Sequence, residues 1–106
     1  MINIAITIGE DAYMLTADGH ANAPRNDQDH DPVCCAVSTI VQTLAFSCAL
    51  IEDVCTVFHT SSGHAMVTVT RFDELEGEIT SRFQMAADGL EALAEQYPEF
   101  IRLDCP

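Results

Sequence analysis

The sequence contains no lysine and no tryptophan, and only four arginines stand against 17 acidic residues, so the formal net charge is −13. Proteins that bind nucleic acid need clustered cations to replace phosphate counterions, and this chain has too few to form a cluster. The same shortage argues against an anionic membrane surface. We expect no nucleic-acid or membrane partner. A basic protein or peptide would be attracted, unless the acidity serves only solubility.

Long apolar runs are also missing, since none approaches the roughly 20 residues that span a bilayer. The first residues, "MINIAITIGEDAY", alternate apolar and polar side chains without a basic flank, which is unlike a signal peptide. The 106 residues show no shift in composition, so we expect one domain over residues 1–106. These absences favour a cytoplasmic protein.

Paired cysteine motifs are absent too. The five cysteines are an odd number without C-x-x-C spacing, and no secretory signal accompanies them. A disulfide framework is therefore not expected. Cys48 and Cys55 fall in apolar periodic segments and are predicted to be small core residues. The sequence assigns no role to Cys105.

Two strands and a helix are predicted in the first half of the chain. Isoleucines at every second position of residues 2–8 are typical of a half-buried strand, and a second strand is predicted over residues 12–18. A polar loop without periodicity follows. Asp31 and Pro32 then begin a helix, because Asp accepts hydrogen bonds from first-turn amides and Pro fits the first helical position.

This helix is apolar on more than one face. One stripe recurs at steps of three and four and comprises Val33, Val37, Ile40, Val41, Leu44, Cys48 and Ile51. The opposite face, which includes Phe46 and Ala49, is not strongly polar either. The second apolar face predicts a contact with a second subunit.

A hairpin and a second helix are predicted in the rest of the chain. Residues 54–59 and 64–71 are rich in β-branched side chains and flank "TSSG". A long helix is predicted over about 73–96, with a core stripe that runs on to Tyr97, and "FIRLDC" could add a last strand. The order β-β-α-β-β-α-β indicates an α/β (α+β) fold with a mixed sheet and two helices in two layers.

The segment from Gly19 to Ser38 holds the residues with chemical potential. His20 lies at the end of the second strand and Cys34 in the first helical turn, where a thiol and its base could face each other. Free amides at a helix start favour a thiolate by only about 0.3–1 kcal/mol, so an imidazolium partner is required. His20 is the first candidate for this partner and His30 the second. Helical geometry mildly favours Cys34 over Cys35, because Cys34 lies at the edge of the apolar stripe.

Two other interpretations of this segment remain open. His20, His30, Cys34 and Cys35 could bind a metal, although adjacent helical cysteines diverge and rarely chelate one tetrahedral ion. Alternatively, Cys34 is a small buried residue and the histidines are loop residues. The sequence Gly-His-Ala recurs at residues 63–65 without a downstream cysteine at a helix start, and we interpret this repeat as coincidence.

Several of these residues resemble the ribosomal-processing cysteine proteases of the Prp family. The family pattern is a strand ending in Gly-His-Ala, a polar loop, then Asp-x-Val-Cys with a Ser four residues after the Cys. The C-terminal "EQYPEFIRLD" resembles the family's acidic-aromatic ending. The matching residues are Gly19, His20, Ala21, Asp31, Val33, Cys34 and Ser38.

The resemblance implies a function. Family members are small α/β homodimers that use no metal, and a Cys-His dyad removes a short N-terminal extension from a large-subunit ribosomal protein. By position, His20 would be the general base and Cys34 the nucleophile. Asp31 would cap the helix or orient the site, and Ser38 and Gly19 would support it. No cofactor is expected, and the expected partner is the extension of a basic ribosomal protein.

One further expectation concerns the oxyanion of the reaction, and a rival hypothesis concerns the function. First-turn amides of the helix are expected to be available to hold the oxyanion of the reaction. The rival hypothesis is a non-catalytic module on the same fold that binds a ribosomal protein or assists assembly without cutting it.

Overall fold

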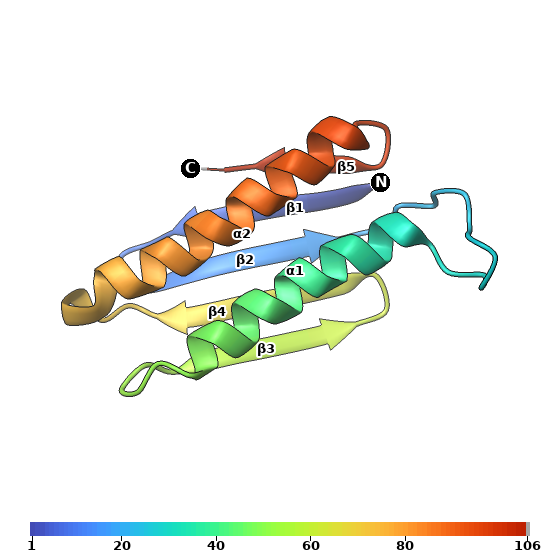
Figure 1. Cartoon of the computed structure of the whole chain (residues 1–106). Helices are drawn as coiled ribbons and strands as arrows, with labels where there is room; N and C mark the ends of the chain where they lie inside the picture. Colours follow the sequence, from blue (N-terminus) through green and yellow to red (C-terminus); the bar gives the residue numbers. More distant parts are fainter. Residues whose placement is uncertain (106) are drawn as a thin grey trace.

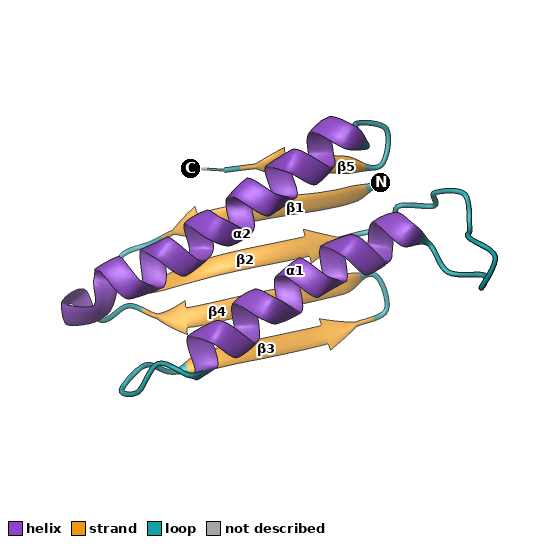
Figure 2. Cartoon of the chain, viewed as in Figure 1, coloured by secondary structure: helices purple, strands orange, loops and turns teal. Residues whose placement is uncertain are grey.

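The computed structural model describes residues 1–105 as two layers, a five-stranded sheet and two long helices that lie across one of its faces (Figures 1 and 2). The strands are β1 (Ile2–Ile8), β2 (Ala12–Asp18), β3 (Thr56–Ser61), β4 (His64–Thr70) and β5 (Ile101–Asp104). The helices are α1 (Pro32–Ala49) and α2 (Glu76–Gln96), and a short 3₁₀ helix, η1 (Asp73–Leu75), leads into α2. The predicted fold class and element order are therefore confirmed.

The strands do not follow chain order across the sheet. Their spatial order is β3-β4-β2-β1-β5. The pairs β1–β2, β2–β4 and β3–β4 are antiparallel, whereas β1 and β5 are parallel. Because β2 pairs with β4, the end of β2 lies beside the start of β4, and Asp18 is opposite His64. This pairing joins two segments that are far apart in the sequence.

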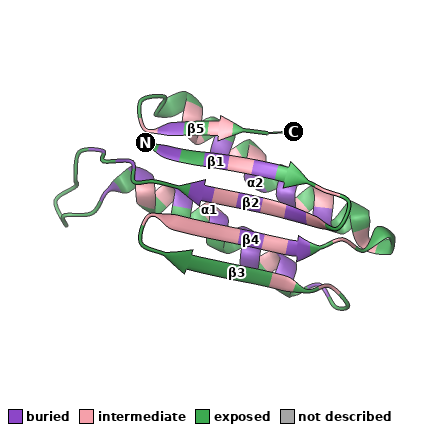
Figure 3. Ribbon diagram, turned by 180° about the vertical axis from the view of Figure 1, so that it is seen from behind, coloured by how far each residue is buried: buried purple, intermediate pink, exposed green. Residues whose placement is uncertain are grey.

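The hydrophobic core lies between the sheet and the helices. Strand side chains alternate between the two faces, so Ile2, Ile4 and Ile6 of β1 are buried while Asn3 and Thr7 are exposed. Figure 3 shows the sheet from its other side, where no helix covers the described strands. The predicted stripe of α1 is buried at Val33, Val37, Val41, Leu44 and Cys48.

Two predictions about single residues are wrong. Cys55 was expected in the core but is exposed, because it precedes β3, an edge strand whose residues are mostly exposed. Tyr97 was expected to continue the buried stripe of α2, yet 37% of its surface is exposed. The helix ends at Gln96, and the backbone of Tyr97 leaves the helical conformation.

The hairpin turn is also tighter than predicted. β3 extends to Ser61 and β4 begins at His64, so only Ser62 and Gly63 form the turn. Gly63 has a φ of +71°, a conformation that glycine adopts without steric cost. This glycine lies at the candidate site described below.

Helix α1 is apolar along its whole length, in line with the sequence pattern. Its 18 residues have a mean hydropathy of 1.6, enough by length and composition to cross a membrane. Core helices of soluble proteins have the same length and composition. The buried side chains of α1 belong to the core that the sheet and α2 share, which accounts for its composition.

Candidate active site

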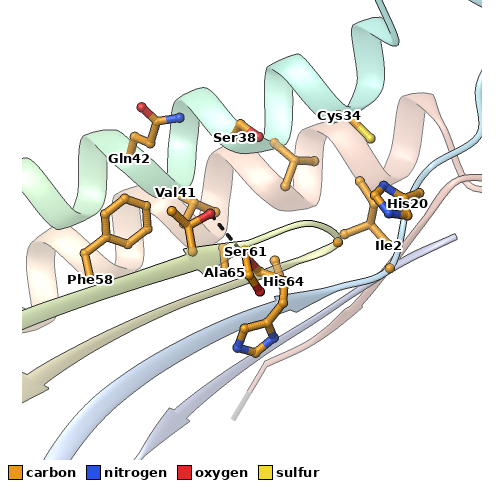
Figure 4. A pocket seen from close by; sticks show the side chains of 15 residues that line it. Ile2, His20, Cys34, Ser38, Val41, Gln42, Phe58, Ser61, His64 and Ala65 are labelled. Atoms are coloured by element: carbon orange, nitrogen blue, oxygen red, sulfur yellow. Dashed lines mark hydrogen bonds between the residues drawn. The ribbon is translucent and has the colours of Figure 1, made fainter.

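A cleft of about 170 Å³ lies between the first half of α1 and the strand ends beside it (Figure 4). Cys34 and Ser38 line it from α1, and Gly19 and His20 line it from the segment after β2. Gly63, in the turn between β3 and β4, completes this end of the cleft. The structure thus brings together the predicted thiol and imidazole, which are separated by a loop in the sequence.

Asp31 fixes the start of α1 and the preceding loop together. Its Oδ1 accepts hydrogen bonds from the amides of Val33, at 3.0 Å, and Cys34, at 3.1 Å. Its Oδ2 accepts a bond from the amide of Ala23, at 3.0 Å. The first two bonds make Asp31 the N-cap of α1, as predicted. The third bond ties the loop after His20 to the helix that carries Cys34.

The carboxylate of Asp31 is buried, with 8% of the residue exposed. Burial by itself would raise the pKa of Asp31, but the donors oppose it, and the net result is a pKa below the ordinary value. The amides of Cys34, Ala23 and Val33 and the side chain of Cys34 cause the lowering. Asp31 is therefore ionised at neutral pH, directly beside Cys34.

The half-buried sulfur of Cys34 accepts a hydrogen bond from the backbone amide of Ala21, at 3.4 Å. The first-turn amides are not free, because those of Val33 and Cys34 donate to the Asp31 side chain and that of Cys35 donates to the Asp31 carbonyl, at 3.0 Å. The expectation that these amides would hold an oxyanion is wrong. The N-cap that starts the helix also occupies its first donors.

The sequence offered no sign of the Ala21 donor. Ala21 belongs to the Gly-His-Ala pattern, but the direction of a backbone amide depends on how the loop after β2 packs against α1. A side-chain pattern does not reveal that direction. The Ala21 amide points its partially positive hydrogen at the sulfur, and the ionised Asp31 carboxylate lies near the same side chain.

His20 is an exposed residue whose ring packs against Gly63. A Cβ atom added to Gly63 would lie 2.8 Å from His20 Nε2 and 3.3 Å from both Cδ2 and Cε1. The amide of Gly19 donates to the carbonyl of Gly63, at 2.8 Å. The two Gly-His-Ala stretches thus lie side by side. The repeat was interpreted above as coincidence, but its two copies are neighbours in the fold.

Gly19 is required for a second reason. Its φ is +100°, and a Cβ atom at this position would collide with the carbonyl oxygen of Met1. A side chain there would displace either β1 or the segment that carries His20. The supporting role that the resemblance implied for Gly19 in the reaction stays a prediction.

The other candidate residues divide into two groups. Ser38 lies one helical turn after Cys34 and lines the same cleft, although its hydroxyl makes no hydrogen bond within residues 1–105. His30 and Cys35 are exposed and do not line the cleft. The backbone of His30 instead exchanges hydrogen bonds with Asn26. Of the two candidate bases, His20 and not His30 therefore shares the cleft with Cys34 and Ser38, and His64 of β4 lines the cleft as well.

The metal hypothesis needs His20, His30, Cys34 and Cys35 to converge. Within residues 1–105, no three His, Cys, Asp or Glu side chains are grouped as metal ligands would be. The geometry favours the nucleophile hypothesis, since a thiol at a helix start and an imidazole in one cleft are the groups that a cysteine protease uses.

Comparison with known proteins agrees with that class. The family model described as cysteine protease Prp matches residues 1–102, and the chain therefore belongs to the Prp family of cysteine proteases. The resemblance stated from the sequence is confirmed. No curated protein matches the sequence.

Solved structures share the fold over the whole chain. The ribosomal processing protease Prp of Staphylococcus aureus, with a covalently linked product peptide, has 23% identity and a TM-score of 0.79, with 100% of both chains covered. Its complex with a substrate peptide has 22% identity and a TM-score of 0.76, with the same coverage. SMU.848 from Streptococcus mutans has 22% identity and a TM-score of 0.72, covering 99% of this chain and 93% of its own.

Proposed function

We propose that the protein is a cysteine endopeptidase that removes a short N-terminal extension from a large-subunit ribosomal protein, with Cys34 as nucleophile and His20 as general base. The observation that carries the proposal is the single cleft that holds the Cys34 thiol, with an amide donor on its sulfur, and the His20 imidazole. Membership of the protease family supports the reaction class. The S. aureus structures, described as a ribosomal processing protease with substrate and product peptides, support the substrate class.

The reaction proceeds through an acyl-enzyme. His20 takes the proton of the Cys34 thiol, and the sulfur attacks the scissile carbonyl carbon. When the tetrahedral intermediate collapses, the imidazolium gives its proton to the leaving amine and a thioester remains on Cys34. His20 then takes a proton from water, whose oxygen attacks the thioester. This step releases the carboxylate product, and the proton returns to the thiol.

The site balances two opposite influences on the thiolate. Asp31 disfavours a negative charge on Cys34, and the Ala21 amide favours it. The bond of a single amide and the helix N-terminus contribute little beside a full charge. A protonated His20 is therefore the group that stabilises the thiolate.

The charge of the molecule suits a basic substrate. Ribosomal proteins bind RNA and are typically basic, whereas this chain has a net charge of −13, so long-range attraction would speed their encounter. The cleft has apolar walls from Ile2, Val37 and Val41 that could hold side chains near the cut bond. A ribosomal-protein substrate implies action in the cytoplasm, and the proposed thiol reaction requires no metal or other cofactor.

The test uses a peptide that copies the N-terminal extension of the host's large-subunit ribosomal protein. We expect the wild type to cut it once. Cys34→Ala should abolish cutting, because it removes the bond-forming atom. His20→Ala should lower kcat by about 10²–10⁴-fold, the usual contribution of a general base. Product masses and progress curves measure both effects.

Matched controls lie in the same segment. Cys35→Ala and His30→Ala should leave kcat within about threefold, because both residues lie outside the cleft. Cys34→Ala should still bind the peptide, since the cleft is intact. Binding by the wild type without cutting would establish the non-catalytic module instead. Cutting that survives Cys34→Ala but not Cys35→Ala would move the nucleophile to Cys35.

A further inference from the structure

The contact between His20 and Gly63 has a consequence for catalysis. Nothing but the α-hydrogens of Gly63 separates its backbone from the imidazole, because a Cβ atom there would lie 2.8 Å from Nε2. Real Cβ atoms essentially never approach another atom this closely. The His20 ring therefore packs directly against the turn between β3 and β4, and Figure 4 shows His20 near the end of that hairpin.

Hydrogen bonds hold the turn between β3 and β4 to the segment that carries His20. The Gly19 amide donates to the Gly63 carbonyl, at 2.8 Å. One residue into each strand, the Asp18 carboxylate and the His64 Nδ1 form a hydrogen bond between the paired ends of β2 and β4. The backbones around His20 and Gly63 are thus held by a main-chain bond and a side-chain bond.

A side chain at position 63 would therefore move the ring rather than the backbone. The backbones of Gly19 and Gly63 directly adjoin the paired strands β2 and β4 and are hydrogen-bonded to each other, whereas His20 is exposed and its side chain can rotate. General-base catalysis requires the imidazole within hydrogen-bond reach of the thiol, so a displaced ring loses its function while the fold persists.

We propose that Gly63 is a positioning residue for the reaction: its missing side chain sets the place of the His20 imidazole opposite Cys34. The proposal rests on the proposed function only in assigning His20 as the base. The proposal gives a second reason, besides the positive φ, for a glycine in the turn between β3 and β4. Asparagine also tolerates a positive φ, yet it carries the Cβ atom that the ring excludes.

The experiment compares Gly63→Ala and Gly63→Asn with Gly77→Ala, a control in α2 where an added Cβ has no atom within 4 Å. Four quantities are measured: kcat for the peptide, KM for the peptide, the rate of Cys34 alkylation by iodoacetamide against pH, and the imidazole NMR signals of His20. Circular dichroism and thermal melts establish folding. If Gly63→Ala does not fold, Gly63→Asn tests the proposal, because asparagine strains a turn with a positive φ less than alanine does.

Both Gly63 variants should lower kcat by on the order of 10²-fold, the cost of displacing a catalytic group by about 1 Å. In both variants the pH dependence of Cys34 alkylation should move toward that of His20→Ala, and the imidazole NMR signals of His20 should shift. Gly77→Ala should match the wild type. In a His20→Ala background, Gly63→Ala should cause no further loss of alkylation, because both changes act through the same ring.

Unchanged His20 signals together with an unchanged alkylation profile in folded Gly63 variants would overturn the proposal. An equal loss in both backgrounds would also overturn it, because the effect would not pass through His20. If His20→Ala leaves the wild-type alkylation profile intact, the proposed base is wrong. The NMR signals then still decide whether Gly63 sets the position of the ring.

Discussion

Cys34 differs from the other cysteines in its surroundings. It is half-buried in a cleft, accepts an amide hydrogen bond and shares the cleft with an imidazole. Burial raises the pKa of the Cys48 thiol. Burial, together with Glu91, Asp104 and Asp88, raises the pKa of the Cys105 thiol. Neither of these two thiols should react readily below neutral pH, because the thiolate is the reactive form.

The first prediction at this scale is selective labelling of Cys34. Limiting iodoacetamide at about pH 6.5 should modify Cys34 before Cys35, Cys55 or Cys105, although those three are exposed. The reason is that exposure alone does not produce a thiolate at this pH, whereas an imidazolium partner does. Mass spectrometry of the digested protein measures the order of labelling. Labelling of Cys35 or Cys105 with Cys34 untouched would contradict the assignment.

At the scale of elements, the start of α1 depends on one side chain. Asp31 satisfies two amides of the helix and one of the loop, so it couples the helix that carries Cys34 to the segment after His20. A cap on the protein surface usually accepts hydrogen bonds only from the amides of its own helix. Loss of Asp31 should therefore affect both stability and the shape of the cleft.

Replacement of Asp31 by alanine should lower the free energy of unfolding by about 1–3 kcal/mol. The estimate combines a lost N-cap with a buried amide, that of Ala23, left without its partner. Urea unfolding at pH 7 measures the change. Asp31→Asn is the matched variant, because its amide oxygen can still cap the helix. A loss below about 0.5 kcal/mol in Asp31→Ala would contradict the role.

The pH dependence of stability follows from the same residue. The pKa of Asp31 in the fold lies below its ordinary value of 3.8, so the ionised carboxylate stabilises the fold above pH 3.8. This contribution is lost as the pH falls from 3.8 through the lowered pKa. The stability difference between wild type and Asp31→Asn should therefore shrink over that acidic range and stay constant above about pH 5. Urea midpoints at several pH values check this.

At the scale of the whole molecule, apolar side chains remain uncovered on the helical layer. Phe46 of α1 is 65% exposed, and Leu50, just after α1, is 82% exposed. Met85 of α2 is 77% exposed. The second apolar face of α1, predicted from the sequence, is thus unburied in the single chain. Burial of such side chains against another chain would be favourable.

We predict a homodimer that uses the Phe46 face of α1. Light scattering at micromolar concentration should give a mass of twice the 11.6 kDa of the chain. Phe46→Glu should shift the mass toward the monomer, because it places a charge in the interface. Met85→Glu, an equally polar change on the other helix, should leave the dimer intact. A monomeric wild type would disprove the prediction.

Much of the fold could be predicted because its signals are local. The alternation in residues 2–8 and 12–18, the Asp31-Pro32 start of α1 and the periodicity of both helices depend on neighbours in the sequence. The site was partly predictable for the same reason. His20 follows closely after β2, which ends at Asp18, and Cys34 lies in the first turn of α1, and those positions follow from the local pattern.

By itself, then, the sequence determined the kind, order and approximate ends of the elements, and it named a thiol and an imidazole that line one cleft. Only the tertiary structure decided that Gly63 lies against His20, that Asp31 occupies the first amides of α1, and that Cys55 is exposed. The physical reason is that these facts depend on partners distant in the chain. The alternation of a strand shows which side chains are buried, but it does not show which strand pairs with it, and the pairing of β2 with β4 built this end of the cleft.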